Sequence, residues 1–164
     1  IDAYKGTFGV EHANILISLS QISETLCILL IPFFLKRFGI KNVMLISMFA
    51  WVLRFGLLGT GNPGDGVWML VLSMLVYGVA FDFFNISGSL YVDKETDPSI
   101  RSSAQGVFMI MTNGFGAFLG SYAAGEVVDI FGWPHSWFIF AAYALAVGIL
   151  FAIVFKYKHN QEIK

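Results

Sequence analysis

The sequence predicts an all-α membrane protein with five transmembrane helices. Hydrophobic residues make up 57% of the chain and charged residues 13%, which is about half the charged share of a soluble domain. The mean hydropathy is +0.72, a value typical of integral membrane proteins. The apolar residues gather in five long runs, and about 20 helical residues suffice to cross the hydrocarbon core of a bilayer.

Short connections separate the predicted elements. Residues 1–11, IDAYKGTFGVE, form a polar lead-in that we expect outside the cytoplasm, and GNPGDG (61–66) is a turn between the second and third helices. Residues 156–164 form a polar tail, so residues 12–155 are expected to form one transmembrane bundle. The five predicted helices are His12–Leu35, Lys41–Thr60, Val67–Val92, Ser103–Val128 and Ser136–Phe155.

Lysine and arginine follow one pattern along the connections. They occur in the first and third connections and in the tail, and the second and fourth connections contain none. The positive-inside rule therefore assigns the basic connections and the C-terminus to the cytoplasm. The charges that decide this are Lys36, Arg37, Lys41, Lys94, Arg101, Lys156, Lys158 and Lys164.

Three ionisable residues on three different helices are predicted near the middle of the membrane. At 1.5 Å per residue, Glu24, Arg54 and Asp82 lie about 18, 20 and 17 Å from the cytoplasmic ends of their helices. A charge at this depth costs about 2.5–3.5 kcal/mol on insertion scales, so it indicates a functional site with a partner. Glu126 is expected at the outer interface, where water is available.

Helical spacing predicts which of these side chains share a face. Gln21 and Glu24 project together, and lipid would not tolerate that face, so we expect it to line a cavity or to meet Arg54. Tyr77 and Phe81 also share a face, being four residues apart.

Asp82 points about 100° away from Phe81. The aromatic rings are therefore expected to face a ligand, and Asp82 to face an ion pair or a proton route. Two structural interpretations remain open: a Glu–Arg pair that only locks helices together, and aromatic rings that only pack. Gly116 and Gly120 form a G-x-x-x-G, which permits close helix approach and indicates no particular activity.

Other functional classes find no support in the residue pattern. His12, His135 and His159 are far apart, Cys27 is a lone cysteine, and no phosphate-binding glycine loop with a lysine is present. We therefore expect no enzymatic activity, no metal or cofactor, and no nucleic-acid partner.

Two connections resemble known loop signatures. PFFLKRFGIK (32–41) resembles the G-x-x-x-D-[RK]-x-G-x-[RK] loop of the major facilitator superfamily: Arg37, Gly39 and Lys41 match, whereas Pro32 replaces the glycine and Lys36 the aspartate. The missing aspartate removes any gating salt bridge that depends on it. YVDKETDPSIRSSAQG (91–106) looks like the equivalent loop between the tenth and eleventh helices.

The order of SQISETL, PFFLKRFGIK, YGVAFDFF and YVDK…R-x-x-AQG resembles the bacterial nucleoside:proton symporters. The resemblance covers nearly the whole chain. It implies helices 8–12 of a twelve-helix transporter in the bacterial cytoplasmic (inner) membrane, with the first seven helices absent. It also implies proton-coupled nucleoside uptake by alternating access, with nucleoside, protons and membrane lipid as partners.

The resemblance further implies roles for the midplane residues. Gln21 and Glu24 would hydrogen-bond the nucleoside, and Tyr77 and Phe81 would wall the nucleobase. Asp82 would be a coupling or structural carboxylate, with Arg54 holding Glu24 or Asp82 charged. The alternatives are a sugar or drug transporter of the same superfamily, a non-transporting scaffold and, with least support, a membrane enzyme.

Overall fold

The computed structural model describes residues 5–156, and within this range the chain is helical with no strand. Three continuous stretches, Ala13–Thr60, Val67–Glu95 and Arg101–Val154, are long and apolar enough to cross a membrane. The predicted all-α class is therefore confirmed. The elements in order are α1 (Phe8–Glu11), α2 (Ala13–Thr60), α3 (Val67–Glu95), α4 (Arg101–Met109), the π-helical segment η2 (Ile110–Gly116) and α5 (Ala117–Val154).

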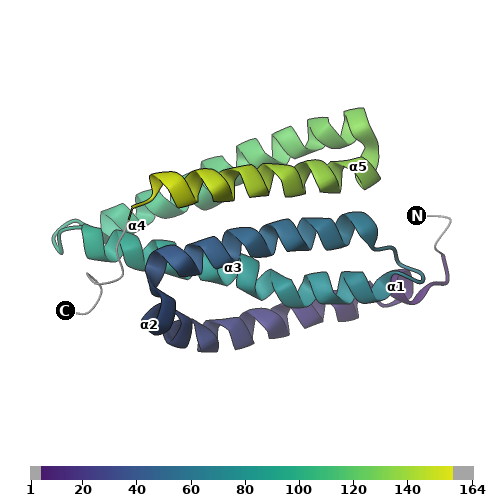
Figure 1. Cartoon of the computed structure of the whole chain (residues 1–164), viewed down its shortest axis with the longest axis horizontal. Coiled ribbons are helices and arrows are strands. Elements are labelled where there is room, and N and C mark those ends of the chain that lie inside the picture. The colour runs from purple at the N-terminus through teal and green to yellow at the C-terminus, as the bar shows by residue number, and fades with distance from the viewer. Residues whose placement is uncertain (1–4, 157–164) are drawn as a thin grey trace.

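Two glycines break the long helices α2 and α5. Gly39 has φ 78° and ψ 166°, and Gly132 has φ 74° and ψ 162°. Glycine adopts positive φ without the steric penalty that a Cβ imposes. The chain doubles back at both positions (Figure 1), so α2 has a first arm (13–38) and a second arm (40–60), and α5 has a first arm (117–131) and a second arm (133–154).

The connections are sorted between the two ends of the bundle. The bend of α2, the α3–α4 connection and the end of α5 lie at one end, and α1, the α2–α3 connection and the bend of α5 lie at the other (Figure 1). The connections that carry lysine and arginine thus share an end.

The best-packed part of the molecule is the contact between the two arms of α2 and α3. Its buried core consists of Cys27, Ile31, Val43 and Phe83, with Phe34 packed against Phe83 at a ring-centroid distance of 5.1 Å. Small buried serines also line the helix contacts, because a small side chain lets two backbones approach closely. These serines are Ser23, Ser47, Ser73, Ser87 and Ser136.

The arm that runs through α4, η2 and the first arm of α5 is far more exposed. Phe118 is 69% exposed and Ile130 is 70% exposed, and neither α4 nor η2 contains a buried residue. An apolar surface of this kind is the one that a membrane helix presents to lipid or to another helix.

Polar contacts tie α3 to α4 beyond their short connection. Arg101 Nε lies 3.0 Å from Asp93 Oδ1, and the side chain of Gln105 exchanges two hydrogen bonds with Ser89, at 2.8 and 2.7 Å. In the connection itself, Asp97 accepts hydrogen bonds from the backbone N–H and the hydroxyl of Ser99. These bonds favour the carboxylate and lower the pKa of Asp97.

The structure differs from the predicted elements in several places. Residues 8–11 of the lead-in form the short helix α1, which was not among the predicted helices. The third helix continues three residues past Val92 to Glu95, and the fourth continues past Val128 to the break at Gly132. The fourth helix also contains η2, whose two glycines put no side chain in the way of the wider turn. Residues 1–4 of the lead-in and 157–164 of the tail lie outside the described range.

Candidate functional site

The first arm of α2 crosses α3 with almost no space between the backbones. Ser23 is buried at this crossing and its hydroxyl donates a hydrogen bond to the carbonyl of Leu75. A Cβ added to Gly78 would lie 2.7 Å from the backbone carbonyl carbon and oxygen of Ser23. Glu24, one residue after Ser23, lies close enough to Tyr77 for electrostatic interaction, whereas Gln21 lies about 160° from Ser23 around the helix axis and is exposed on the side away from α3.

Gln21 and Glu24 differ in exposure. The side chain of Gln21 is exposed and that of Glu24 is half-buried. Within residues 5–156, Glu24 makes neither an ion pair nor a hydrogen bond. A carboxylate accepts hydrogen bonds through two oxygens, so Glu24 retains its full capacity to bind a polar ligand.

Tyr77 and Phe81 stack on one another along α3. Their ring centroids are 5.6 Å apart and the rings are inclined by 15°. This is the shared face that the spacing of four residues predicts. Both side chains are half-buried, so part of each ring is accessible.

Arg54 contacts rings and a carbonyl instead of an acid. Its guanidinium carbon lies 4.4 Å from the centroid of the Tyr77 ring and 5.7 Å from that of Trp51. Its Nη1 donates a hydrogen bond of 3.2 Å to the carbonyl of Ser73. Among residues 5–156, neither acid of the midplane group lies within ion-pair distance of Arg54.

The expected ion pair with Glu24 or Asp82 is thus not formed, for a geometric reason. Arg54 faces the side of α3 that carries Ser73 and Tyr77, one helical turn apart. Asp82 lies five residues beyond Tyr77, which turns it about 140° away around the helix axis.

Asp82 is buried without a full set of partners. Its side chain is 7% exposed, and Oδ2 has no hydrogen-bond partner among the described residues. Asp82 lies close enough to Glu24 and to Cys27 for electrostatic interaction with both. A buried carboxylate oxygen without a donor is costly, which makes Asp82 a candidate for binding a proton or a ligand.

The loop motif identified in the sequence forms the bend of α2. Gly39 makes the reversal, and the guanidinium carbon of Arg37 lies 5.7 Å from the ring centroid of Phe38. Lys41 Nζ donates a hydrogen bond of 3.0 Å to the carbonyl of Ala152, in the last turn of α5. A cation at this position also interacts favourably with the negative end of the helix dipole.

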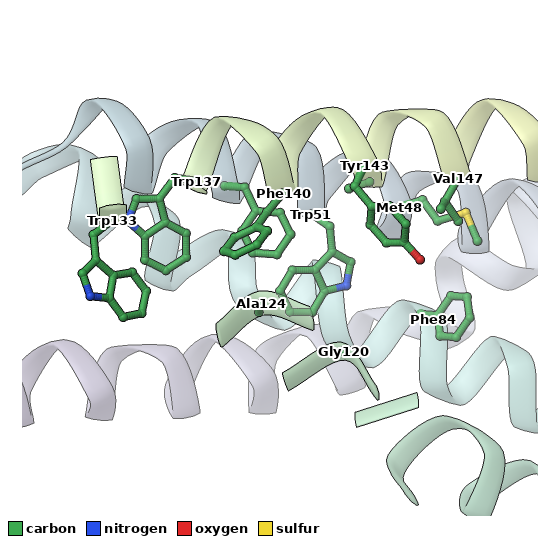
Figure 2. A pocket seen from close by; sticks show the side chains of 12 residues that line it. Met48, Trp51, Phe84, Gly120, Ala124, Trp133, Trp137, Phe140, Tyr143 and Val147 are labelled. Atoms are coloured by element: carbon green, nitrogen blue, oxygen red, sulfur yellow. The ribbon is translucent and has the colours of Figure 1, made fainter. Parts of the chain in front are cut away.

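The sequence analysis did not predict an aromatic pocket between the second arm of α2 and the two arms of α5. Figure 2 shows this pocket, which has a volume of about 580 Å³. Trp51, Phe55, Trp137 and Phe140 form a connected ring cluster along it, with centroid distances of 5.3, 6.2, 5.8 and 5.9 Å. The abundance of aromatic residues is the one feature of the sequence that is consistent with such a pocket. Its walls offer few polar groups, whereas a nucleoside requires several.

Comparison with known protein families decides the classification. The family model described as nucleoside H⁺ symporter matches residues 2–160. The chain belongs to this family. The resemblance inferred from the loop and helix motifs is therefore confirmed.

Relatives in the nucleoside H⁺ symporter family are similar over most of the chain. Nucleoside permease NupG of Escherichia coli (strain K12) is 55% identical over 163 residues, and xanthosine permease of the same organism is 53% identical over 166 residues. These matches cover 95% and 97% of this chain but 39% and 40% of the relatives. The chain thus spans about two fifths of the length of these permeases.

A solved structure of the same family has the same fold. The crystal structure of nucleoside transporter NupG matches with a TM-score of 0.85 at 56% identity, covering 92% of this chain and 39% of that one. A D323A mutant of NupG matches with a TM-score of 0.88. The fold is therefore that of a bacterial membrane transporter of the major facilitator type.

Proposed function

We propose that this chain is the C-terminal part of a proton-coupled nucleoside importer that works by alternating access. The match of residues 2–160 to the nucleoside H⁺ symporter family carries this proposal. The geometry supports it, because Glu24 and an aromatic pair, Tyr77 and Phe81, come together at the crossing of α2 and α3, and the exposed Gln21 lies one helical turn before Glu24 on the open side of α2. This combination suits a nucleoside, whose sugar hydroxyls need hydrogen-bond partners and whose base needs a flat apolar surface.

In this proposal the chain crosses the membrane five times. The breaks at Gly39 and Gly132 divide the three long apolar stretches into five segments, which correspond to helices 8–12 of a twelve-helix transporter. Seven preceding helices would complete the cavity and cover the exposed face of Gln21. The basic connections and the C-terminus would lie in the cytoplasm.

The proposed division of labour follows from burial. Gln21 and Glu24 bind polar groups of the nucleoside, because both retain unused hydrogen-bonding capacity. Tyr77 and Phe81 wall the base. Asp82, buried behind them and close to Glu24, is the candidate for proton coupling, since gaining a proton removes an unfavourable buried charge.

Uptake of labelled uridine into cells tests the function. A full-length transporter carrying this sequence is expected to accumulate uridine, and an ionophore that collapses the proton gradient is expected to abolish accumulation. Thermal shift of the purified protein supplies the comparison between solutes. Stabilisation by uridine but not by a sugar or a lipophilic cation supports the proposal. Stabilisation by the sugar or the cation alone contradicts it, and a scaffold would respond to none of the three.

Accessibility of single cysteines tests the membrane arrangement separately. Cysteines introduced in GNPGDG are expected to react with an impermeant maleimide in intact cells, and cysteines in the α3–α4 connection only after the membrane is permeabilised. The reverse pattern would overturn the assigned orientation.

A further inference from the structure

Arg54 is the cation among the three ionisable residues near the middle of the membrane, and among residues 5–156 it forms no ion pair with an acid. Within residues 5–156 its charge is met by the ring faces of Tyr77 and Trp51 and by the carbonyl of Ser73. A cation over a ring within about 6 Å of its centroid is attracted by the negative face of the ring, most strongly where water is excluded. The two rings and the carbonyl therefore take the place of a counter-ion.

These contacts also restrict Tyr77. The ring is stacked against Phe81, lies edge-on to Trp51 at 6.2 Å and 88°, and is covered by the guanidinium of Arg54 at 4.4 Å. Because Arg54 also donates a hydrogen bond to the carbonyl of Ser73, it contacts two successive turns of α3. A change in the Tyr77 rotamer would break its contacts with Phe81, Trp51 and Arg54 at the same time.

The same arrangement leaves Glu24 without a cation. Arg54 is engaged on the face of α3 that carries Ser73 and Tyr77, and Glu24 makes no ion pair within the described residues. A salt bridge between Arg54 and Glu24 would occupy the acceptor oxygens of that carboxylate. With Arg54 held by Tyr77, those oxygens stay available.

We infer that Arg54 is a positioning residue for nucleoside recognition, which acts through the ring of Tyr77 and does not touch the nucleoside. It holds Tyr77 stacked on Phe81, which fixes the position of both rings at the candidate site. It also keeps its own charge away from Glu24. This inference rests on the proposed function, because the fixed ring positions contribute to recognition only if a base packs beside them.

The chemistry of the side chain predicts a graded response to substitution. Arginine is planar and lies flat on an aromatic face, whereas lysine is a compact point charge. Arg54→Lys is therefore expected to keep part of the interaction with Tyr77, and Arg54→Met to lose all of it.

A double-mutant cycle in the full-length transporter tests whether Arg54 acts through Tyr77. The dissociation constant for uridine is measured for Arg54→Met, for Tyr77→Leu and for the double variant. Arg54→Met is expected to weaken binding about 2- to 30-fold, the range of a cation–π contact, and Arg54→Lys by less. In the Tyr77→Leu background, Arg54→Met is expected to have almost no further effect. Multiplying losses in the double variant would overturn the inference.

Arg37→Met serves as the matched control, because Arg37 also lies over a ring, that of Phe38, but at the bend of α2. Uridine affinity is expected to be unchanged in this variant. An equal loss there would show a general effect of removing an arginine and would contradict a specific role for Arg54.

A ligand-free measurement separates this inference from the proposed function. In an experimental structure of Arg54→Met, the stacking of Tyr77 on Phe81 is expected to be lost or displaced. An unmoved Tyr77 ring would overturn the positioning role, even if uridine binds. A wild-type protein that binds no nucleoside would overturn the proposed function, while the ring position in the variant would still decide what Arg54 does to Tyr77.

Discussion

Ser23 and Gly78 form the closest helix contact at the candidate site, and the missing side chain of Gly78 makes it possible. A Cβ there would meet the backbone carbonyl carbon and oxygen of Ser23 at 2.7 Å, closer than carbon atoms pack. Gln21 and Glu24 flank Ser23, and Tyr77 and Phe81 flank Gly78. The contact therefore sets the distance between the polar and the aromatic halves of the site.

Gly78→Ala is expected to separate α2 from α3 and to weaken uridine binding about tenfold or more, because a shift of a few tenths of an ångström misaligns both halves of the site. The dissociation constant for uridine measures the effect. Gly106→Ala is the control, since a Cβ at Gly106 meets no atom within 4 Å. That variant should bind normally and be slightly more stable, as alanine favours helix over glycine by about 1 kcal/mol. Normal binding by Gly78→Ala would show that the contact does not position the site.

Glu24→Gln keeps the shape of the side chain and removes its charge. If Glu24 accepts hydrogen bonds from the sugar, the weaker neutral acceptor should raise the KM for uridine uptake by about tenfold, the difference of roughly 1.5 kcal/mol between charged and neutral bonds. Glu126→Gln is the control, because Glu126 is an exposed acid close to the bend of α5. Undiminished uptake by Glu24→Gln would remove Glu24 from the binding role.

Asp82→Asn removes a proton-binding group from a buried position. We expect this variant to lose accumulation driven by a proton gradient but to exchange internal for external uridine, because exchange requires no net proton movement. Its thermal stability should be unchanged or higher, since an unpaired buried carboxylate oxygen is replaced by a neutral amide. Asp129→Asn, at an exposed acid, is the control. Gradient-driven accumulation by Asp82→Asn would exclude Asp82 from coupling.

Gly39→Ala tests the bend of α2. Gly39 combines φ 78° with ψ 166°, a region that essentially only glycine occupies and that costs other residues about 1–3 kcal/mol, so the variant should unfold at a lower temperature in detergent. Gly56→Ala is the control on the same helix, because a Cβ there meets no atom within 4 Å. Equal melting temperatures for Gly39→Ala and the wild type would show that the bend accommodates a side chain.

The Asp93–Arg101 pair is expected to contribute little stability on its own. The two side chains are 42% and 40% exposed, and a pair this accessible to solvent is worth at most about 1 kcal/mol. Asp93→Asn should therefore lower the melting temperature by only a few degrees, and less so at high salt. A large loss that does not depend on salt would show that the pair is shielded, for example by other parts of the transporter.

Sequence reasoning predicted what depends on one helix at a time. The five apolar runs, the sorting of basic connections and the shared face of Tyr77 and Phe81 all follow from composition and helical period. The contact partners of Arg54 could not be predicted in this way, because they depend on how the second arm of α2 is rotated against α3. Depth alone placed Arg54 level with two acids, and the rotation turned it toward Tyr77.

Features that involve small residues were also hard to predict. The spacing of Gly116 and Gly120 suggested close helix packing, yet a Cβ at Gly120 would meet no atom within 4 Å in the described structure. Gly78, which does allow close packing, belongs to no G-x-x-x-G pattern. Whether a glycine permits close packing depends on the helix that lies against it, and the sequence of one helix does not show which helix that is.

The reversals at Gly39 and Gly132 each connect two helical arms through a single residue, with no loop between them. A single residue outside helical geometry joins two long arms, so the ends of the two arms at each reversal have to stay close together. For the same reason, an epitope tag inserted at either reversal should disrupt the protein, whereas the longer GNPGDG turn offers room for one.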